Sequence, residues 1–230
     1  MDEALLPCVE VGPREGARAS VVWMHGLGAD GHDFAPIVPA LQLPRVRFVF
    51  PHAPALPVTI NGGFVMPAWY DIVSLTHTGA RENSDHIRAS ARRIVALVER
   101  ERARGTPADK IVIAGFSQGG AMALHVGLRY PEALAGVLVL SAYHLLPETY
   151  LAERSEANRR APIFFGHGAL DPLVPSYLGR AAHDQIVAAD APGTRDVSWR
   201  EYRMEHAVCP EEIADIAVWL RRVLEPAAAG

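Results

Sequence analysis

The stretch that decides the fold is Ile111-Val112-Ile113-Ala114-Gly115-Phe116-Ser117-Gln118-Gly119-Gly120. Its first four residues form a short apolar run typical of a buried strand, and the small and apolar residues after Gly119 favour a helix. A serine between two glycines at a strand-to-helix turn matches G-x-S-x-G, in which a strained backbone presents the hydroxyl above a sheet. We therefore interpret Ser117 as a catalytic nucleophile, and we disfavour the alternative of a tight turn with an incidental serine.

Similar apolar runs and helical patterns alternate on both sides of this turn. We expect strands over 20–25, 46–50, 111–114, 136–140, 163–165 and 197–204, helices over 85–104, 119–129, 177–189 and 210–224, and an antiparallel edge strand within 5–11. Runs that are apolar on both faces are typical of parallel strands covered by helices. The alternation predicts a mostly parallel, doubly wound α/β sheet with helices on both faces. With the G-x-S-x-G turn between a strand and a helix, this arrangement resembles the α/β-hydrolase fold. No repeat or low-complexity linker interrupts it, so we expect one domain over residues 1–230.

Composition excludes several classes of function. The net charge of -4 and the absence of a basic stripe argue against a nucleic-acid partner. Two cysteines are too few for a disulfide framework, and reduced thiols are the simpler interpretation. The acidic N-terminus does not resemble a secretory signal, and no apolar run approaches the roughly 18 residues of a membrane helix. We expect a soluble, cytoplasmic protein without stable membrane insertion.

Residues 53–84 break the alternation of strands and helices. The segment is long and rich in proline and glycine, and long loops inside compact domains are usually functional or disordered. Apolar runs flank Asn61-Gly62, which predicts a hairpin, and the apolar residues after it include Trp69. We interpret the segment as a flap or pocket wall near Ser117; the alternative is a hairpin that only covers the core.

A serine hydroxyl needs an adjacent base, and this fold places its triad in the order Ser, acid, His. Of the ten histidines, His206 fits best because it follows the last expected strand and precedes the last helix. Asp171 lies in the loop after the strand at 163–165, where a carboxylate can orient the imidazole. The alternatives are a helix-capping or turn aspartate and a surface histidine; His144, His167 and His183 fit less well as the base.

The expected oxyanion hole combines two backbone N–H groups. One is the N–H of Gln118, directly after the nucleophile, and the other is the N–H of Leu27, in the glycine-rich loop after the strand at 20–25. This loop lacks the third glycine of a nucleotide-binding motif. His25 and His32 have no supporting cluster of ligands, so we expect neither a metal nor a cofactor.

Taken together, these motifs resemble the phospholipase/carboxylesterase family of α/β hydrolases, which includes bacterial carboxylesterases and acyl-protein thioesterases. The resemblance covers about residues 10 to 224 and is carried by His25-Gly26-Leu27-Gly28-Ala29-Asp30-Gly31, Asn61-Gly62-Gly63, Ala68-Trp69-Tyr70-Asp71-Ile72, Gly115-Phe116-Ser117-Gln118-Gly119, His167-Gly168 with Asp171, and His206 with Cys209. It implies Ser117, Asp171 and His206 as the triad and Leu27 and Gln118 as oxyanion donors. It also implies hydrolysis of short to medium acyl esters without a metal or cofactor, often by a homodimer.

The chain departs from the family pattern at two positions. Pro67 stands where the family usually has arginine, and Glu205 stands where it usually has glycine before the catalytic histidine. Both changes bear on substrate preference more than on the class of reaction.

Three functions remain open from the sequence. The first is a serine carboxylesterase acting on small esters through an acyl-enzyme on Ser117. The second is an acyl-protein thioesterase or lysophospholipase, which needs a long acyl channel. We expect Phe64, Val65, Trp69 and Leu173, together with Leu27, to form the wall of that channel. The third is a non-catalytic binding module, disfavoured because every member of the expected triad is present.

Overall fold

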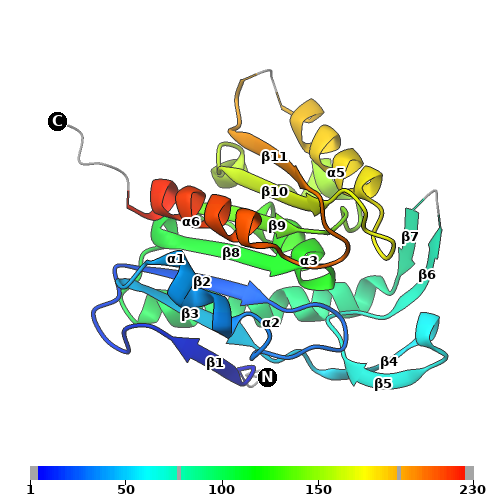
Figure 1. Ribbon diagram of the computed structural model, residues 1–230, viewed down its shortest axis with the longest axis horizontal. Coiled ribbons are helices and arrows are strands. Elements are labelled where there is room, and N and C mark those ends of the chain that lie inside the picture. Colours follow the sequence, from blue (N-terminus) through cyan, green and yellow to red (C-terminus); the bar gives the residue numbers. More distant parts are fainter. Residues whose placement is uncertain (1–4, 77–78, 191–192, 226–230) are drawn as a thin grey trace.

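The computed structural model describes residues 5–76, 79–190 and 193–225. Within them, a seven-stranded sheet has the order β1-β3-β2-β8-β9-β10-β11 (Figure 1). Only β1 is antiparallel to its neighbour, and the other pairs are parallel. The strands are β1 (Cys8–Val11), β2 (Ala19–Met24), β3 (Val46–Pro51), β8 (Ile111–Phe116), β9 (Gly136–Leu140), β10 (Ile163–Gly168) and β11 (Val197–Tyr202).

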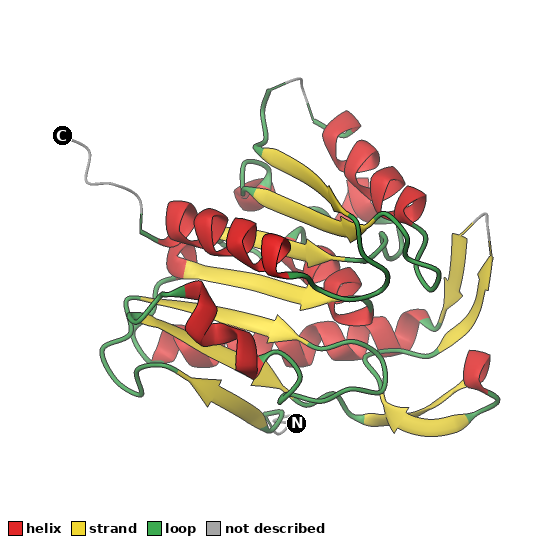
Figure 2. Ribbon diagram, in the orientation of Figure 1, coloured by secondary structure: helices red, strands yellow, loops and turns green. Residues whose placement is uncertain are grey.

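Helices cover both faces of this sheet (Figure 2). The helices α2 (Ser84–Ala103), α3 (Gln118–Gly127) and α5 (Ser176–Ala188) contribute to one apolar core, and α1 (Val38–Leu41) and α6 (Pro210–Leu224) contribute to the other. The short α4 (Tyr150–Glu153) and the 3-10 helices η1 (Ala35–Ile37), η2 (Thr59–Asn61), η3 (Ala108–Lys110) and η4 (Glu156–Asn158) lie in connections. The sheet with a core on each face explains why its central strands are apolar on both sides.

The predicted fold class is confirmed, as are the expected strands and the four longer helices, with bounds shifted by a few residues. The edge strand within 5–11 is antiparallel, as expected. The sequence did not indicate α1 and α4, because a helix of four residues is too short to show a periodic pattern.

The segment 53–84 forms two hairpins at the carboxyl edge of the sheet, where the triad candidates also lie (Figure 1). The first pairs β4 (Ala55–Val58) with β5 (Phe64–Pro67), around η2 and two glycines with positive φ. This confirms the expected hairpin, although its connection is longer than a two-residue Asn-Gly turn. The second hairpin pairs β6 (Ile72–Thr76) with β7 (Gly79–Glu82), and the sequence did not indicate it.

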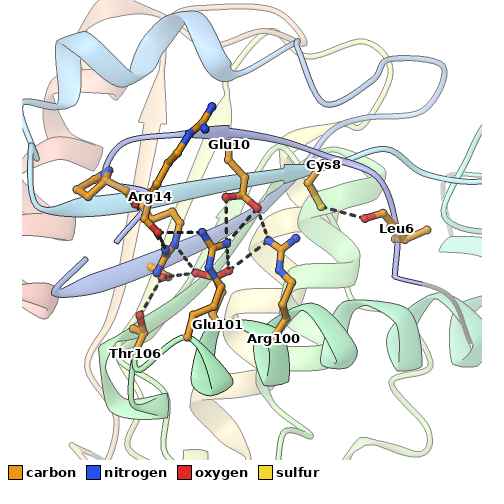
Figure 3. Close-up of polar contacts among 11 residues, drawn as sticks. Leu6, Cys8, Glu10, Arg14, Arg100, Glu101 and Thr106 are labelled. Atoms are coloured by element: carbon orange, nitrogen blue, oxygen red, sulfur yellow. Dashed lines mark hydrogen bonds and ion pairs between the residues drawn. The ribbon is translucent and has the colours of Figure 1, made fainter. Parts of the chain in front are cut away.

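A buried ion network fastens the edge of the sheet to α2 (Figure 3). The Glu101 carboxylate is fully buried, and it accepts hydrogen bonds from Arg47 Nε at 2.7 Å and from Ser20 Oγ at 2.8 Å. Arg104 donates to Glu101 at 3.0 Å and also to Glu10 on β1. Because Arg47 is only 2% exposed, the two buried charges depend on each other for compensation.

Candidate active site

Ser117 lies at the turn between β8 and α3, in a conformation that few non-glycine residues adopt. Its φ is 55° and its ψ is -122°, and its backbone N–H donates to Leu140 O at 2.8 Å. A Cβ added at Gly115 would collide with the backbone oxygen of Gly119, so the turn is closed too tightly for a side chain there. The surrounding sheet and helix therefore impose the strained backbone, which points to a functional position.

Two hydrogen bonds connect Ser117 to a histidine and an aspartate from later strands. Ser117 Oγ lies 2.9 Å from His206 Nε2, and His206 Nδ1 lies 2.6 Å from Asp171 Oδ2. Asp171 follows β10 and His206 lies between β11 and α6, so parallel strands deliver all three side chains to one edge. A carboxylate only accepts, so Nδ1 carries the imidazole proton and Nε2 is free to accept the proton of Ser117.

The Asp171 carboxylate is buried and strongly hydrogen-bonded. Its Oδ1 accepts from the N–H of Leu173 at 2.9 Å and from the N–H of Val174 at 2.8 Å. Burial by itself raises the pKa of Asp171, but the hydrogen bond with His206 and those from the backbone outweigh it, so the pKa is lowered overall. Asp171 is therefore ionised at neutral pH and holds the ring of His206 in one orientation.

The three alternative histidines have other partners. His167 Nε2 donates to Val174 O at 2.8 Å, and burial lowers the pKa of this histidine. His144 Nδ1 lies 3.0 Å from Gln185 Oε1, and His183 Nδ1 lies 2.7 Å from an Asp184 oxygen. None of these contacts leads to Ser117.

The glycine-rich loop after β2 lies directly against Ser117. A Cβ added at Gly26 would sit 3.4 Å from Ser117 Cβ, and Gly28 N–H donates to Pro67 O at 2.9 Å. His25 fixes the loop, because its Nδ1 donates to Gly26 O at 2.7 Å while its Nε2 accepts from Ala53 N–H at 3.1 Å.

Leu27 and Gln118 present backbone N–H groups suited to an oxyanion. Within the described ranges, no acceptor takes the Leu27 N–H. Gln118 is the first residue of α3, where N–H groups have no intrahelical partner. Both residues line the same cavity as Ser117. Two free donors and a helix N-terminus beside a nucleophile can stabilise negative charge on a tetrahedral intermediate.

The cavity at Ser117 has a volume of about 380 Å³ and is mostly apolar. Its wall combines the glycine-rich loop, η2, β6 and the loop after Asp171. It is lined by Gly26, Leu27, Ala29, Asp33, Ile60, Asn61, Tyr70, Ile72, Leu75, Phe116, Ser117, Gln118, Tyr143, Leu173, Val174 and His206. Leu27 and Leu173, both expected in the wall, are among them.

Three residues expected in the wall lie elsewhere. Trp69 is fully buried behind the cavity, where its Nε1 donates to His25 O at 2.8 Å. Phe64 and Val65 lie on β5, are 68% and 59% exposed, and do not line the cavity. The reason is the fold of the segment: β5 pairs with β4 in a hairpin that leaves the Phe64 and Val65 side chains exposed, and the chain is fully buried again at Trp69. Apolar character alone could not distinguish these positions.

The sequence does not indicate the role of the Gln118 side chain. This side chain is buried; its Oε1 accepts from Trp69 N–H at 2.7 Å, and its Nε2 donates to Tyr70 O at 2.7 Å. Gln118 thus holds the chain at Trp69 and Tyr70 against the turn between β8 and α3. The Tyr70 hydroxyl, in turn, lies 3.1 Å from the Tyr143 hydroxyl at the side of the cavity. No local sequence signal indicates either contact.

The two departures from the family pattern have modest structural effects. Pro67 ends β5, and its carbonyl accepts the Gly28 N–H, a contact that uses only the backbone. The residue Glu205 is exposed, which agrees with an orientation toward solvent.

Comparisons with known proteins agree with this geometry. Residues 8–224 match the model of the phospholipase/carboxylesterase family. The chain is 34% identical to acyl-protein thioesterase 1 of Cryptococcus neoformans, in an alignment that covers 94% of this chain and 97% of that protein. It is 35% identical to acyl-protein thioesterase 1 of Gibberella zeae, in an alignment that covers 90% of this chain and 92% of that protein.

Solved structures show the same fold. Arabidopsis thaliana SOBER1 superposes with a TM-score of 0.83 at 30% identity, covering 91% of this chain and 100% of that chain. Zea mays acyl-protein thioesterase 2 superposes with a TM-score of 0.83 at 28% identity, covering 95% and 99%. With the match over residues 8–224, these similarities show that the chain is a serine hydrolase acting on ester or thioester bonds, and that it belongs to the phospholipase/carboxylesterase family of α/β hydrolases.

Proposed function

We propose that this protein hydrolyses acyl thioesters, and oxygen esters of similar shape, through an acyl-enzyme formed on Ser117. The observation that carries the proposal is the unbroken relay from Ser117 Oγ to His206 Nε2 at 2.9 Å and from His206 Nδ1 to Asp171 Oδ2 at 2.6 Å. The relay opens onto an apolar cavity with two backbone N–H donors beside it. Such a site serves acyl transfer.

The acylation step follows from the relay. Ser117 Oγ attacks the acyl carbon while His206 Nε2 takes the hydroxyl proton, and the carbonyl oxygen becomes an oxyanion held by the N–H groups of Leu27 and Gln118. When the tetrahedral intermediate collapses, the bond to the leaving group breaks and His206 gives its proton to the departing sulfur or oxygen. Asp171 stabilises the imidazolium that forms between these two proton transfers.

Deacylation repeats the sequence with water. His206 takes a proton from a water molecule, the hydroxide attacks the acyl carbon, and the bond to Ser117 Oγ breaks. The proton then returns from His206 to Ser117, and a free carboxylic acid leaves. No metal or redox partner is needed for this balance.

We propose thioesters ahead of oxygen esters as substrates because of the names of the relatives. Two relatives that match over nine-tenths or more of this chain are named acyl-protein thioesterases. The apolar lining, with Ile72, Leu75 and Leu173, suits an acyl chain. A short-to-medium acyl carboxylesterase is the second candidate, favoured by the cavity volume of about 380 Å³, which lies near the lower end of ordinary ligand sites.

The test measures kcat/KM for thioesters and oxygen esters that carry the same acyl groups. Acyl lengths from about two to sixteen carbons show how binding of the transition state changes with the length of the acyl chain. Thioester rates that exceed oxygen-ester rates and rise with chain length support the thioesterase. A maximum at short oxygen esters supports the carboxylesterase.

Ser117→Ala and a fluorophosphonate probe connect either activity to the site. We expect Ser117→Ala to abolish turnover and labelling, while Ser176→Ala, a matched hydroxyl deletion at the start of α5, keeps both. If Ser117→Ala retained more than a few per cent of the activity, on a scale where triad loss costs several orders of magnitude, the nucleophile would be misassigned. Absence of turnover and of labelling in the native protein would favour the binding module.

Two other expectations stay predictions: the homodimer and the cytoplasmic location. Within the described ranges, no helix is both long enough and apolar enough to cross a membrane.

A further inference from the structure

Asp33 places a carboxylate without a partner on the wall of the catalytic cavity. It follows the glycine-rich loop, and its backbone N–H donates to Asp30 O at 3.1 Å. Among the described residues, its side chain has no hydrogen bond and no ion pair. The residue is exposed, yet desolvation of its carboxylate against the cavity wall raises the pKa of Asp33; the nearby His25 opposes this and Asp30 adds to it. A carboxylate in this position is stabilised by any cation that enters the cavity.

No other wall residue of this cavity is an Asp, Glu, Lys or Arg, counted over the described part of the chain. The remaining polar groups of the wall are neutral side chains or members of the relay, such as Asn61, Tyr70 and Tyr143. Among the residues that the structure describes, the only fixed charge on the wall is therefore negative, and no cation of that part of the chain pairs with it.

Ring contacts connect the segment that carries Asp33 with His206, the residue that protonates the leaving group in the proposed mechanism. The neighbouring Phe34 packs against Phe116 with ring centroids 5.5 Å apart, and Phe116 packs against the ring of His206 at 4.7 Å. Because His206 Nε2 must protonate the leaving atom, the leaving group lies beside His206. The apolar β6 residues Ile72 and Leu75 belong to another part of the wall, suited to the acyl chain.

We propose that Asp33 selects esters and thioesters whose leaving group carries a positive charge, such as a protonated amine or a quaternary ammonium. The inference rests on the proposed hydrolysis at Ser117 and adds the class of leaving group to it. Anionic leaving groups are disfavoured by the same carboxylate.

The experiment compares two isosteric thioesters, butyrylthiocholine and the neutral S-(3,3-dimethylbutyl) thiobutyrate, by release of free thiol. For the native enzyme we expect kcat/KM of the cationic substrate to exceed that of the neutral one by roughly fivefold or more, as for a partly exposed charge pair. Asp33→Asn, which removes the charge but keeps the shape, should bring this ratio close to one. High salt should reduce the ratio in the native enzyme.

The ratio separates selection of charge from a general effect on catalysis. If Asp33 merely supported the fold or the imidazolium, Asp33→Asn would slow both substrates and leave the ratio unchanged, which would overturn the proposal. Asp30→Asn is the matched control: Asp30 lies on the same loop but does not line the cavity, and its Oδ1 only accepts the His32 N–H at 2.7 Å. It should keep the native ratio.

The neutral thioester also separates this inference from the proposed function. Turnover of the neutral substrate that depends on Ser117, with equal rates for the cationic one, overturns only the role of Asp33. Absence of turnover of both substrates, and of every thioester and oxygen ester in the acyl-length series, overturns both proposals.

Discussion

Replacing Glu212 by glutamine should stabilise the fold far more at alkaline than at mildly acidic pH. Glu212 lies on α6, its side chain is fully buried, and neither carboxylate oxygen has a partner among the described residues. Its Oε1 packs against the backbone of β10, where a Cβ at Gly166 would collide with it. Burial raises the pKa of Glu212 from 4.5 to about 8, and the charge of Asp215 adds to the effect.

The magnitude follows from the linkage between ionisation and folding. In the unfolded chain Glu212 ionises near pH 4.5, whereas in the folded protein it stays protonated up to about pH 8. Between these values the unfolded state has lost a proton that the folded state keeps, so the free energy of unfolding falls by about 1.4 kcal/mol per pH unit. From pH 6 to pH 8 the fall amounts to about 2.3 kcal/mol, since half of the folded molecules are ionised at the upper end.

The assay is urea unfolding of the native protein, Glu212→Gln and the control Glu211→Gln at pH 6 and pH 8. Glu211 is the exposed neighbour of Glu212 on the same helix. The stability difference between Glu212→Gln and the native protein should be about 2 kcal/mol more favourable to the variant at pH 8 than at pH 6. A buried amide also lacks partners, but that cost is equal at both pH values and cancels. Equal differences at the two pH values would refute the reasoning.

Two further predictions concern the relay and the ion network. Asp171→Asn should lower kcat by about 10⁴-fold with the fold retained, because an amide permits the wrong tautomer of His206. Steady-state kinetics and circular dichroism measure the two effects. A loss of kcat below about tenfold would place the catalytic acid elsewhere. Glu101→Ala should lower the free energy of unfolding by about 3–5 kcal/mol, since it leaves the buried Arg47 charge unpaired. In urea unfolding, a loss below about 1 kcal/mol, similar to the loss expected for Glu156→Ala in an exposed pair, would contradict it.

Much of the fold was predictable from the sequence because parallel strands buried on both faces leave a strong local signal. The runs at 111–114 and 136–140 correspond to the central strands β8 and β9, which are buried almost throughout. The alternation of strands and helices then restricts where polar residues can meet, because the carboxyl ends of all parallel strands lie at one edge of the sheet. The structure brings Ser117, Asp171 and His206 together there, although their catalytic roles stay predictions.

The wall of the cavity could not be predicted in the same way. Trp69 and Val65 are both apolar and only four residues apart, yet one is fully buried and the other is 59% exposed. What separates them is long-range contact: the backbone of Trp69 is held by Gln118, 49 residues later in the chain, and by Ser90 Oγ at 2.5 Å. A short apolar run carries no information about partners at that distance.

The segments that form the cavity wall differ from those that position the relay. The relay lies at the ends of β8, β10 and β11, which are fixed by two apolar cores, whereas the cavity wall comes mostly from connecting segments. Gln118 belongs to both parts, because its N–H faces the expected oxyanion while its side chain holds the wall at Tyr70. Changes in β6 or at Asp33 can therefore alter the acyl or leaving-group preference without moving the relay, whereas a change at Gln118 would affect both at once.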